Sequence, residues 1–192
     1  MPVFLENTDL ETHLKALKTT IVFVSAWTAL FLYGWTVVRL AVEALPSPRP
    51  RLLWTIGCMV YAVHVVSAFD VFFHWSHAAA HRETELRSMA VTGVRAGWGI
   101  WLNYLFGAVW IADTIWWYAV GDERYRKRGA KSFWLLHGFI LFMMFNGAFV
   151  FVDRWARWPG LILFLVSLWA VITLSRRRFE QFRDKPAMAP TP

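Results

Sequence analysis

Five long apolar runs constrain this chain more than any other feature of its sequence. A membrane-spanning helix needs about 20 predominantly apolar residues, at a rise of about 1.5 Å per residue. Only helices and closed barrels satisfy their backbone groups in lipid, and these runs lack the alternating pattern of barrel strands. We therefore predict an all-α, polytopic membrane helix bundle with about five transmembrane helices, at residues 19–38, 52 to about 75, 96–121, 132–152 and 158–175.

The amino-acid composition agrees with the prediction of a membrane helix bundle. The 192 residues are 57% hydrophobic and 17% charged, whereas soluble domains average about 45–50% apolar and about 25% charged. We expect a short amphipathic segment at 1–18, the bundle at 19–178 and a cytoplasmic tail at 179–192 that is disordered at its end. Acidic residues precede the first run where a signal peptide has basic ones, so the first span should be retained. The single cysteine, Cys58, excludes an internal disulfide and a cysteine-rich zinc site.

The basic residues predict an orientation. Thirteen of the 20 Lys and Arg residues fall near 39–51, 124–131 and 176–185, all on one side of the predicted bundle. Basic loops stay in the cytoplasm, so we expect the N-terminus outside and the C-terminus inside a cytoplasmic (inner) membrane. The net charge of +7 is explained by topology and anionic lipid, so we expect the lipid bilayer, and other membrane subunits, as partners and no nucleic acid.

A row of ionisable residues follows the second run. At about 100° per residue in a continuous helix, Asp70, His74, His77 and His81 fall within an arc of about 60°. Such spacing presents imidazole and carboxylate ligands to one ion, and histidine prefers zinc, copper or iron. The row predicts a transition-metal site near the outer face, completed by Asn103, Glu83 or Glu85. The alternative is a set of partly wetted imidazoles at the membrane interface.

A second group of polar residues lies toward the cytoplasmic end. Helix rise places His137 at about 8 Å, Asp113 at about 12 Å and His64 at about 18 Å from that end. An unpaired charge is costly there, so we expect Asp113 to be protonated or paired with a protonated histidine. The trio predicts a proton relay or ordinary hydrogen bonds between helices. Haem b held by the two histidines is less favoured, because their depths differ by about 10 Å.

Thirteen tryptophans are also unusual for this length. Most lie near the predicted span ends, as expected for the aromatic belts of a membrane protein. The third run is different, because five residues at helical spacing form one face with an acid in it. This face could line a pocket for a lipid, a quinone or another flat ligand, or could be packing; its residues are Asn103, Phe106, Trp110, Asp113 and Trp117.

Two functions follow from these patterns. The first is a membrane protein whose buried His/Asp site near the outer face binds a transition metal and can support redox chemistry. The alternative is a non-enzymatic membrane protein, an ion or proton path or an accessory subunit, whose polar residues relay protons or join helices. No glycine-rich phosphate loop or serine-centred elbow is present, so nucleotide-driven and serine-hydrolase chemistry are not expected.

Overall fold

The fold is all-α, as predicted. The structure, a computed structural model, describes residues 3–43, 48–152 and 155–183, and this part of the chain contains no strand. The end of the expected tail, 184–192, lies outside the described residues. The elements are α1 (Val3–Val42), α2 (Arg49–Ala68), the π-helix η1 (Phe69–Phe73), α3 (His77–Thr92), α4 (Gly99–Arg126), α5 (Ala130–Phe145), the π-helix η2 (Asn146–Val150) and α6 (Arg157–Arg183).

In the described residues, four stretches of helix are long and apolar enough to cross a membrane, as expected of a multi-pass membrane protein. They are Leu10–Val42, Arg49–Phe73, Ala130–Val150 and Arg157–Arg177. The third predicted span corresponds to α4, which has 28 residues and is also long enough. Its mean hydropathy is lower because it carries Asn103 and Asp113 together with several Trp and Tyr residues.

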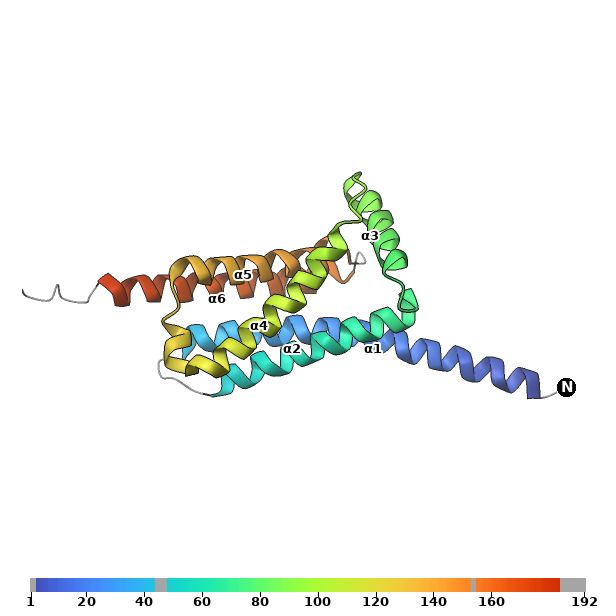
Figure 1. The fold of residues 1–192 in the computed structure, drawn as a ribbon, viewed down its shortest axis with the longest axis horizontal. Coiled ribbons are helices and arrows are strands. Elements are labelled where there is room, and N and C mark those ends of the chain that lie inside the picture. Colours follow the sequence, from blue (N-terminus) through green and yellow to red (C-terminus); the bar gives the residue numbers. More distant parts are fainter. Residues whose placement is uncertain (1–2, 44–47, 153–154, 184–192) are drawn as a thin grey trace, which may run out of the picture.

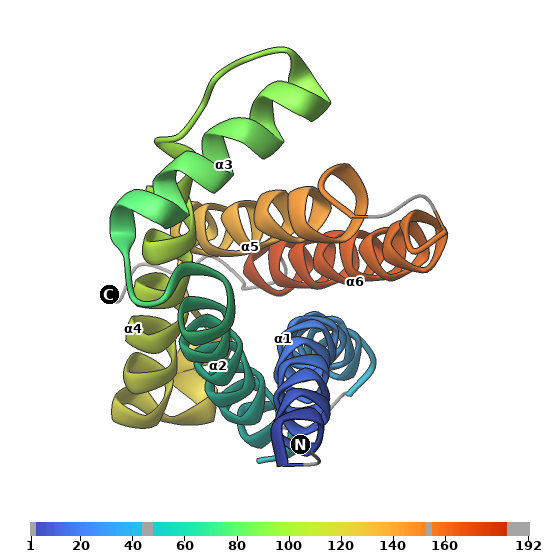
Figure 2. The ribbon, with the colours of Figure 1, turned by 90° about the vertical axis from the view of Figure 1, so that its right-hand side faces the viewer.

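The long helices run side by side along the molecule. In Figure 1, α1, α2, α5 and α6 follow the long axis, whereas α4 crosses them diagonally. Down the axis, α5 and α6 form one pair, and α1 lies beside α2 and α6 (Figure 2). The centre between them is filled mainly by large aromatic side chains. Those that are completely or almost completely buried include Tyr33, Trp54, Trp110, Trp117, Tyr125 and Phe133.

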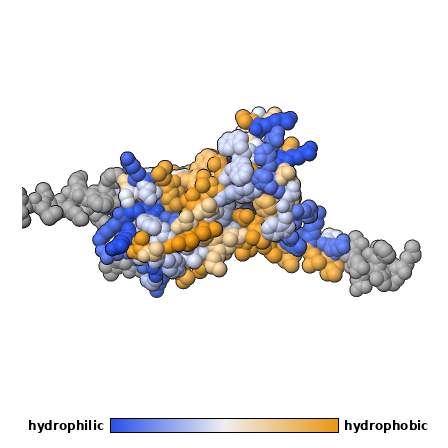
Figure 3. All heavy atoms as spheres, in the orientation of Figure 1, coloured by the Kyte–Doolittle hydropathy of each residue, from blue (hydrophilic) through white to orange (hydrophobic). Residues whose placement is uncertain are grey.

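Hydropathy divides the molecule into an apolar middle and polar ends (Figure 3). One end carries the last turn of α1, the start of α2, the end of α4 and the C-terminal end of α6 (Figure 1). The described residues of the three basic segments lie at these element ends and at the start of α5. Exposed tryptophans mark the opposite end, where α2 finishes and α4 and α6 begin: Trp75, Trp98, Trp155 and Trp158. This is the belt that the sequence predicts for a membrane interface.

The region after the second span differs from the sequence prediction. We expected one helix to continue beyond residue 75. Instead, the α-helix α2 is followed by the π-helix η1, which ends at Phe73. His74 and Trp75 have φ of 45° and 60°, in the left-handed region, so the chain turns sharply here. The side chain of Ser76 caps the new helix by accepting a hydrogen bond from the Ala79 amide at 3.2 Å. As a result, α3 points away from the bundle (Figures 1 and 2).

The expected amphipathic segment at 1–18 is not a separate element in the described residues. It continues directly into the first span, and α1 is one helix of 40 residues. Similarly, α6 extends to Arg183, so the described start of the expected tail at 179–183 is helical.

Candidate functional site

The central polar feature is an ion pair between Asp113 of α4 and Arg128, which follows α4. An Arg128 guanidinium nitrogen donates to Asp113 Oδ1 at 2.7 Å, and the two side chains are only 8% and 2% exposed. The Tyr125 hydroxyl donates to Asp113 Oδ2, also at 2.7 Å. Both carboxylate oxygens are therefore occupied by strong donors, and we call these three residues the Asp113 clamp.

A glycine allows the chain to form this clamp. Gly121 lies within α4 at φ 76° and ψ 168°, a conformation that a residue with a Cβ atom rarely adopts. It bends the chain so that residues 122–128, which we call the return segment, fold back toward Asp113. Tyr125 then stacks on Trp117, with ring centroids 3.6 Å apart and planes 7° from parallel.

Other contacts fix the return segment at both edges. The Trp117 indole Nε1 donates to Asp122 Oδ1 at 2.8 Å. Arg51 of α2 lies 3.8 Å from Asp122, and Arg126 lies 3.9 Å from Glu43, just after α1. The return segment therefore connects the end of α4 to both α1 and α2.

The Arg128 guanidinium is also covered by aromatic rings. It lies 4.0 Å from the centroid of Tyr125 and 4.7 Å from that of Trp116. Cations bind the faces of such rings, and the interaction strengthens when water is removed. The rings therefore compensate part of the cost of burying the charge.

His137 occupies the same core but has a different partner. Its Nδ1 lies 3.3 Å from the hydroxyl of Tyr33, and its ring contacts Phe133 and Trp54, with centroids 4.5 Å and 6.1 Å away. Trp54 in turn contacts Trp117. We call Tyr33, Trp54, Trp110, Trp117, Phe133 and His137 the aromatic core.

His64 belongs to neither group. Its Nδ1 lies 2.9 Å from the carbonyl oxygen of Val22, so it links α2 to α1. The structure therefore gives His64, Asp113 and His137 different hydrogen-bond partners. The expectation that a histidine pairs with Asp113 requires correction, since the pairing charge is Arg128. The sequence reasoning assigned Arg128 to the basic connection after α4 and so missed its role.

The outer row is divided by the turn at His74. Asp70 pairs with Lys18 of α1 at 2.9 Å, and both side chains are exposed. His77 and His81 lie on α3 instead, one helical turn apart, with ring centroids separated by 6.4 Å. His77 Nδ1 lies 2.8 Å from the hydroxyl of Tyr104.

No cluster of three or more His, Cys, Asp or Glu residues able to hold a metal occurs in the described residues. Glu83 and Glu85, the proposed additional ligands, pair with Arg87 at 2.7 Å and Arg95 at 3.4 Å. The metal site stays a prediction. Of the four residues expected to share one face of one helix, only the two histidines of α3 lie on the same α-helix.

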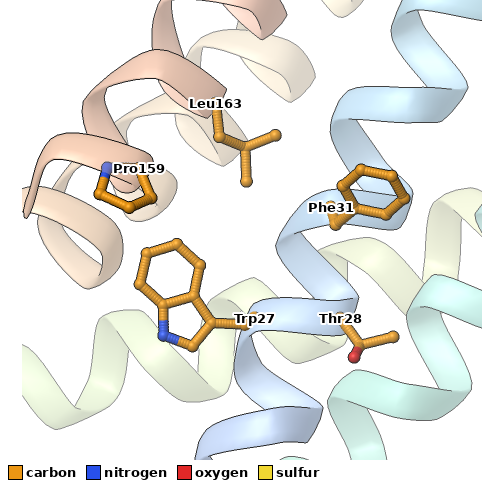
Figure 4. A pocket seen from close by; sticks show the side chains of 5 residues that line it. All are labelled: Trp27, Thr28, Phe31, Pro159 and Leu163. Carbon is orange, nitrogen blue, oxygen red and sulfur yellow. The ribbon is translucent and has the colours of Figure 1, made fainter. Parts of the chain in front are cut away.

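The face of the third run is mostly packing. Phe106, Trp110, Asp113 and Trp117 are all buried, and the first two contact each other and Tyr61. A hollow lies elsewhere, between α1 and α6 (Figure 4). This groove measures about 390 Å³ and is lined by Trp27, Thr28, Phe31, Pro159 and Leu163. Sequence reasoning did not find it, because its two sides are distant in the chain.

Comparison with models of protein families, with curated proteins and with solved structures finds no match for this chain.

The clamp gives a test of its contribution to stability. Arg128→Ala should lower the free energy of unfolding in detergent micelles by about 3–5 kcal/mol, because Asp113 then remains buried without its counter-ion. The double variant Asp113→Asn with Arg128→Gln replaces the charges by neutral hydrogen-bonding groups and should be clearly more stable than Arg128→Ala. Lys127→Ala is the matched control, since its pair with Glu123 is exposed and should contribute only about 0–1 kcal/mol. Equal effects of Arg128→Ala and Lys127→Ala would contradict a buried pair.

Proposed function

We propose that this chain is a non-enzymatic, multi-pass membrane protein whose buried polar residues join helices rather than relay protons. The observation that carries the proposal is the Asp113 clamp. Both oxygens of Asp113 are engaged, by Arg128 at 2.7 Å and Tyr125 at 2.7 Å. Short hydrogen bonds to both oxygens hold this carboxyl group in one place and tie α4 to the return segment, as a structural joint requires.

The other polar contacts support the same function. His64 bonds to a backbone carbonyl of α1, and His137 lies within the aromatic core beside Tyr33. Each histidine therefore connects two helices. A relay needs a chain of groups that exchange protons across the membrane. Trp54 and Trp110 of the aromatic core are fully buried, and an indole N–H donates a hydrogen bond but does not exchange protons in this way.

A measurement of proton flux distinguishes a structural role of these polar residues from a proton relay. Protein reconstituted into vesicles that contain a pH-sensitive dye should conduct no more protons, under an imposed potassium diffusion potential, than protein-free vesicles. The clamp double variant, Asp113→Asn with Arg128→Gln, should behave identically. A flux in the natural protein that the folded double variant loses would overturn the proposal and favour the relay.

We further propose that the N-terminus lies outside and the C-terminus inside a cytoplasmic (inner) membrane of bacterial type. The support is the concentration of basic segments at one end of the bundle, because basic loops are retained in the cytoplasm. The clamp then lies near the cytoplasmic interface, and α3 lies on the outer side.

Labelling of single cysteines tests this orientation. In a Cys58→Ala chain, Ala16→Cys should react with a membrane-impermeant maleimide in intact spheroplasts. Ala187→Cys, in the C-terminal tail, should react only after the membrane is permeabilised. The reverse pattern would invert the topology.

A transition-metal function is the second candidate, and one observation favours it. His77 and His81 are spaced i, i+4 on α3 with ring centroids 6.4 Å apart, a spacing by which a helix presents two imidazoles to one zinc, copper or iron ion. Tyr104 holds His77 through Nδ1, an outer-shell contact of the kind that orients metal-binding imidazoles. Redox chemistry at this site would need a redox-active ion, copper or iron.

Metal analysis of protein purified without chelator tests this candidate. We expect bound metal that is lost in the double variant His77→Ala with His81→Ala, because both imidazoles would be ligands. His13→Ala, which removes an exposed histidine of α1, should leave the metal content unchanged. Equal metal content in all three proteins would exclude His77 and His81 as ligands.

A further inference from the structure

One face of α1 carries an unbroken heptad pattern. Apolar side chains recur at alternating steps of four and three residues and, except for one threonine, are between 40% and 58% exposed. We call this face the heptad stripe; it comprises Leu10, Leu14, Leu17, Ile21, Val24, Thr28, Phe31 and Trp35. A spacing of 3.5 residues sustained over several heptads is the signature of a left-handed coiled coil.

The first part of the stripe lies beyond the rest of the bundle. Helix α1 has 40 residues, or about 60 Å at 1.5 Å per residue, which is about twice the hydrocarbon thickness of a bilayer. Lys18 of α1 forms an ion pair with Asp70. Residues 3–17, which precede Lys18, extend past the other helices (Figure 1). Between the leucines this part of the helix carries Glu11 and Lys15, charges that are costly in hydrocarbon.

Neither lipid tails nor the membrane surface can cover these leucines. The extension is collinear with the membrane-crossing part of α1 (Figure 1), so it cannot lie flat on the headgroups as an interfacial helix does. Among residues 10–18, leucines occupy only two positions per heptad, at Leu10, Leu14 and Leu17. This narrow stripe is the width of a coiled-coil seam rather than of a core-facing helix.

The groove between α1 and α6 lies along the same stripe. Thr28 and Phe31 belong to the stripe and also line the groove, together with Trp27 from α1 and Pro159 and Leu163 from α6 (Figure 4). A helix laid along the stripe would face this hollow. Coiled-coil packing needs such holes, because each seam residue inserts between residues of the facing helix.

We propose that a second copy of this chain covers the heptad stripe, so that two α1 helices form a parallel, in-register coiled coil. Two copies inserted in one membrane are parallel by necessity. A two-fold axis along the membrane normal brings each stripe residue opposite its own equivalent, which is how a self-complementary interface forms. Lys18, beside the stripe, has its charge paired with Asp70 in the same chain, which reduces repulsion between the copies.

Disulfide trapping in native membranes tests the dimer. In the Cys58→Ala chain, Leu14→Cys or Leu17→Cys should be oxidised to a species of twice the 22.3 kDa monomer mass, because seam positions face their own equivalents. Ala16→Cys is the matched control, exposed on the same extension but outside the stripe. We expect several-fold more cross-linked protein at 14 and 17 than at 16. Equal or absent cross-linking at all three sites, with equal reactivity toward maleimide, would overturn the proposal.

A second measurement does not depend on cysteine chemistry. Leu14→Glu with Leu17→Glu should convert the dimer to a monomer in mild detergent, measured by light scattering, because like charges would meet across the seam. Ala16→Glu should leave the dimer intact. A natural protein that is monomeric in both membranes and detergent would mean that no second copy covers the stripe, and the proposal would be wrong.

Discussion

The buried ion pair between Asp113 and Arg128 is the interaction on which the half of the bundle around the end of α4 depends. Removing two charges from water costs several kcal/mol per ion, and their attraction repays this only with good geometry and further hydrogen bonds. Tyr125 supplies one such bond at 2.7 Å, and aromatic faces cover the guanidinium. Because α5 begins at Ala130, two residues after Arg128, the pair also fixes where α5 enters the bundle.

The ion pair gives a reason for the abundance of tryptophan and tyrosine, because their rings pack around it. Trp117 stacks on Tyr125, which holds Asp113, and it also contacts Trp54, which contacts His137. Each ring offers a large apolar area, a few also donate a hydrogen bond, and such side chains can surround a charge without admitting water. The clamp and His137 are therefore parts of one packed unit that connects α1, α2, α4 and α5.

The sequence predicted the helical class and the positions of the long helices, because apolar length is a strong local signal. It failed at His74, where two non-glycine residues adopt left-handed angles, since periodicity carries no information about such a turn. It also missed Arg128, because the partner of Asp113 follows a bend at Gly121 that no spacing rule anticipates. The predicted helical spacing of His77 and His81 is found in the structure because both lie on the regular helix α3. Asp70 and His74 precede this helix and do not continue the row.

Helix α1 shows where the chain's own contacts stop explaining its structure. One face, with Ala29, Tyr33 and Val37, is buried in the core, which accounts for the half of the helix inside the bundle. In the extension that precedes Lys18, Leu10, Leu14 and Leu17 are between 48% and 58% exposed. They keep the same register as the exposed residues further along the helix. In the proposed dimer, a second α1 helix, equally long and parallel, covers this stripe from the bundle to the extension. Lipid tails would cover only the part of the stripe within the membrane, because the extension carries charges such as Glu11 and Lys15.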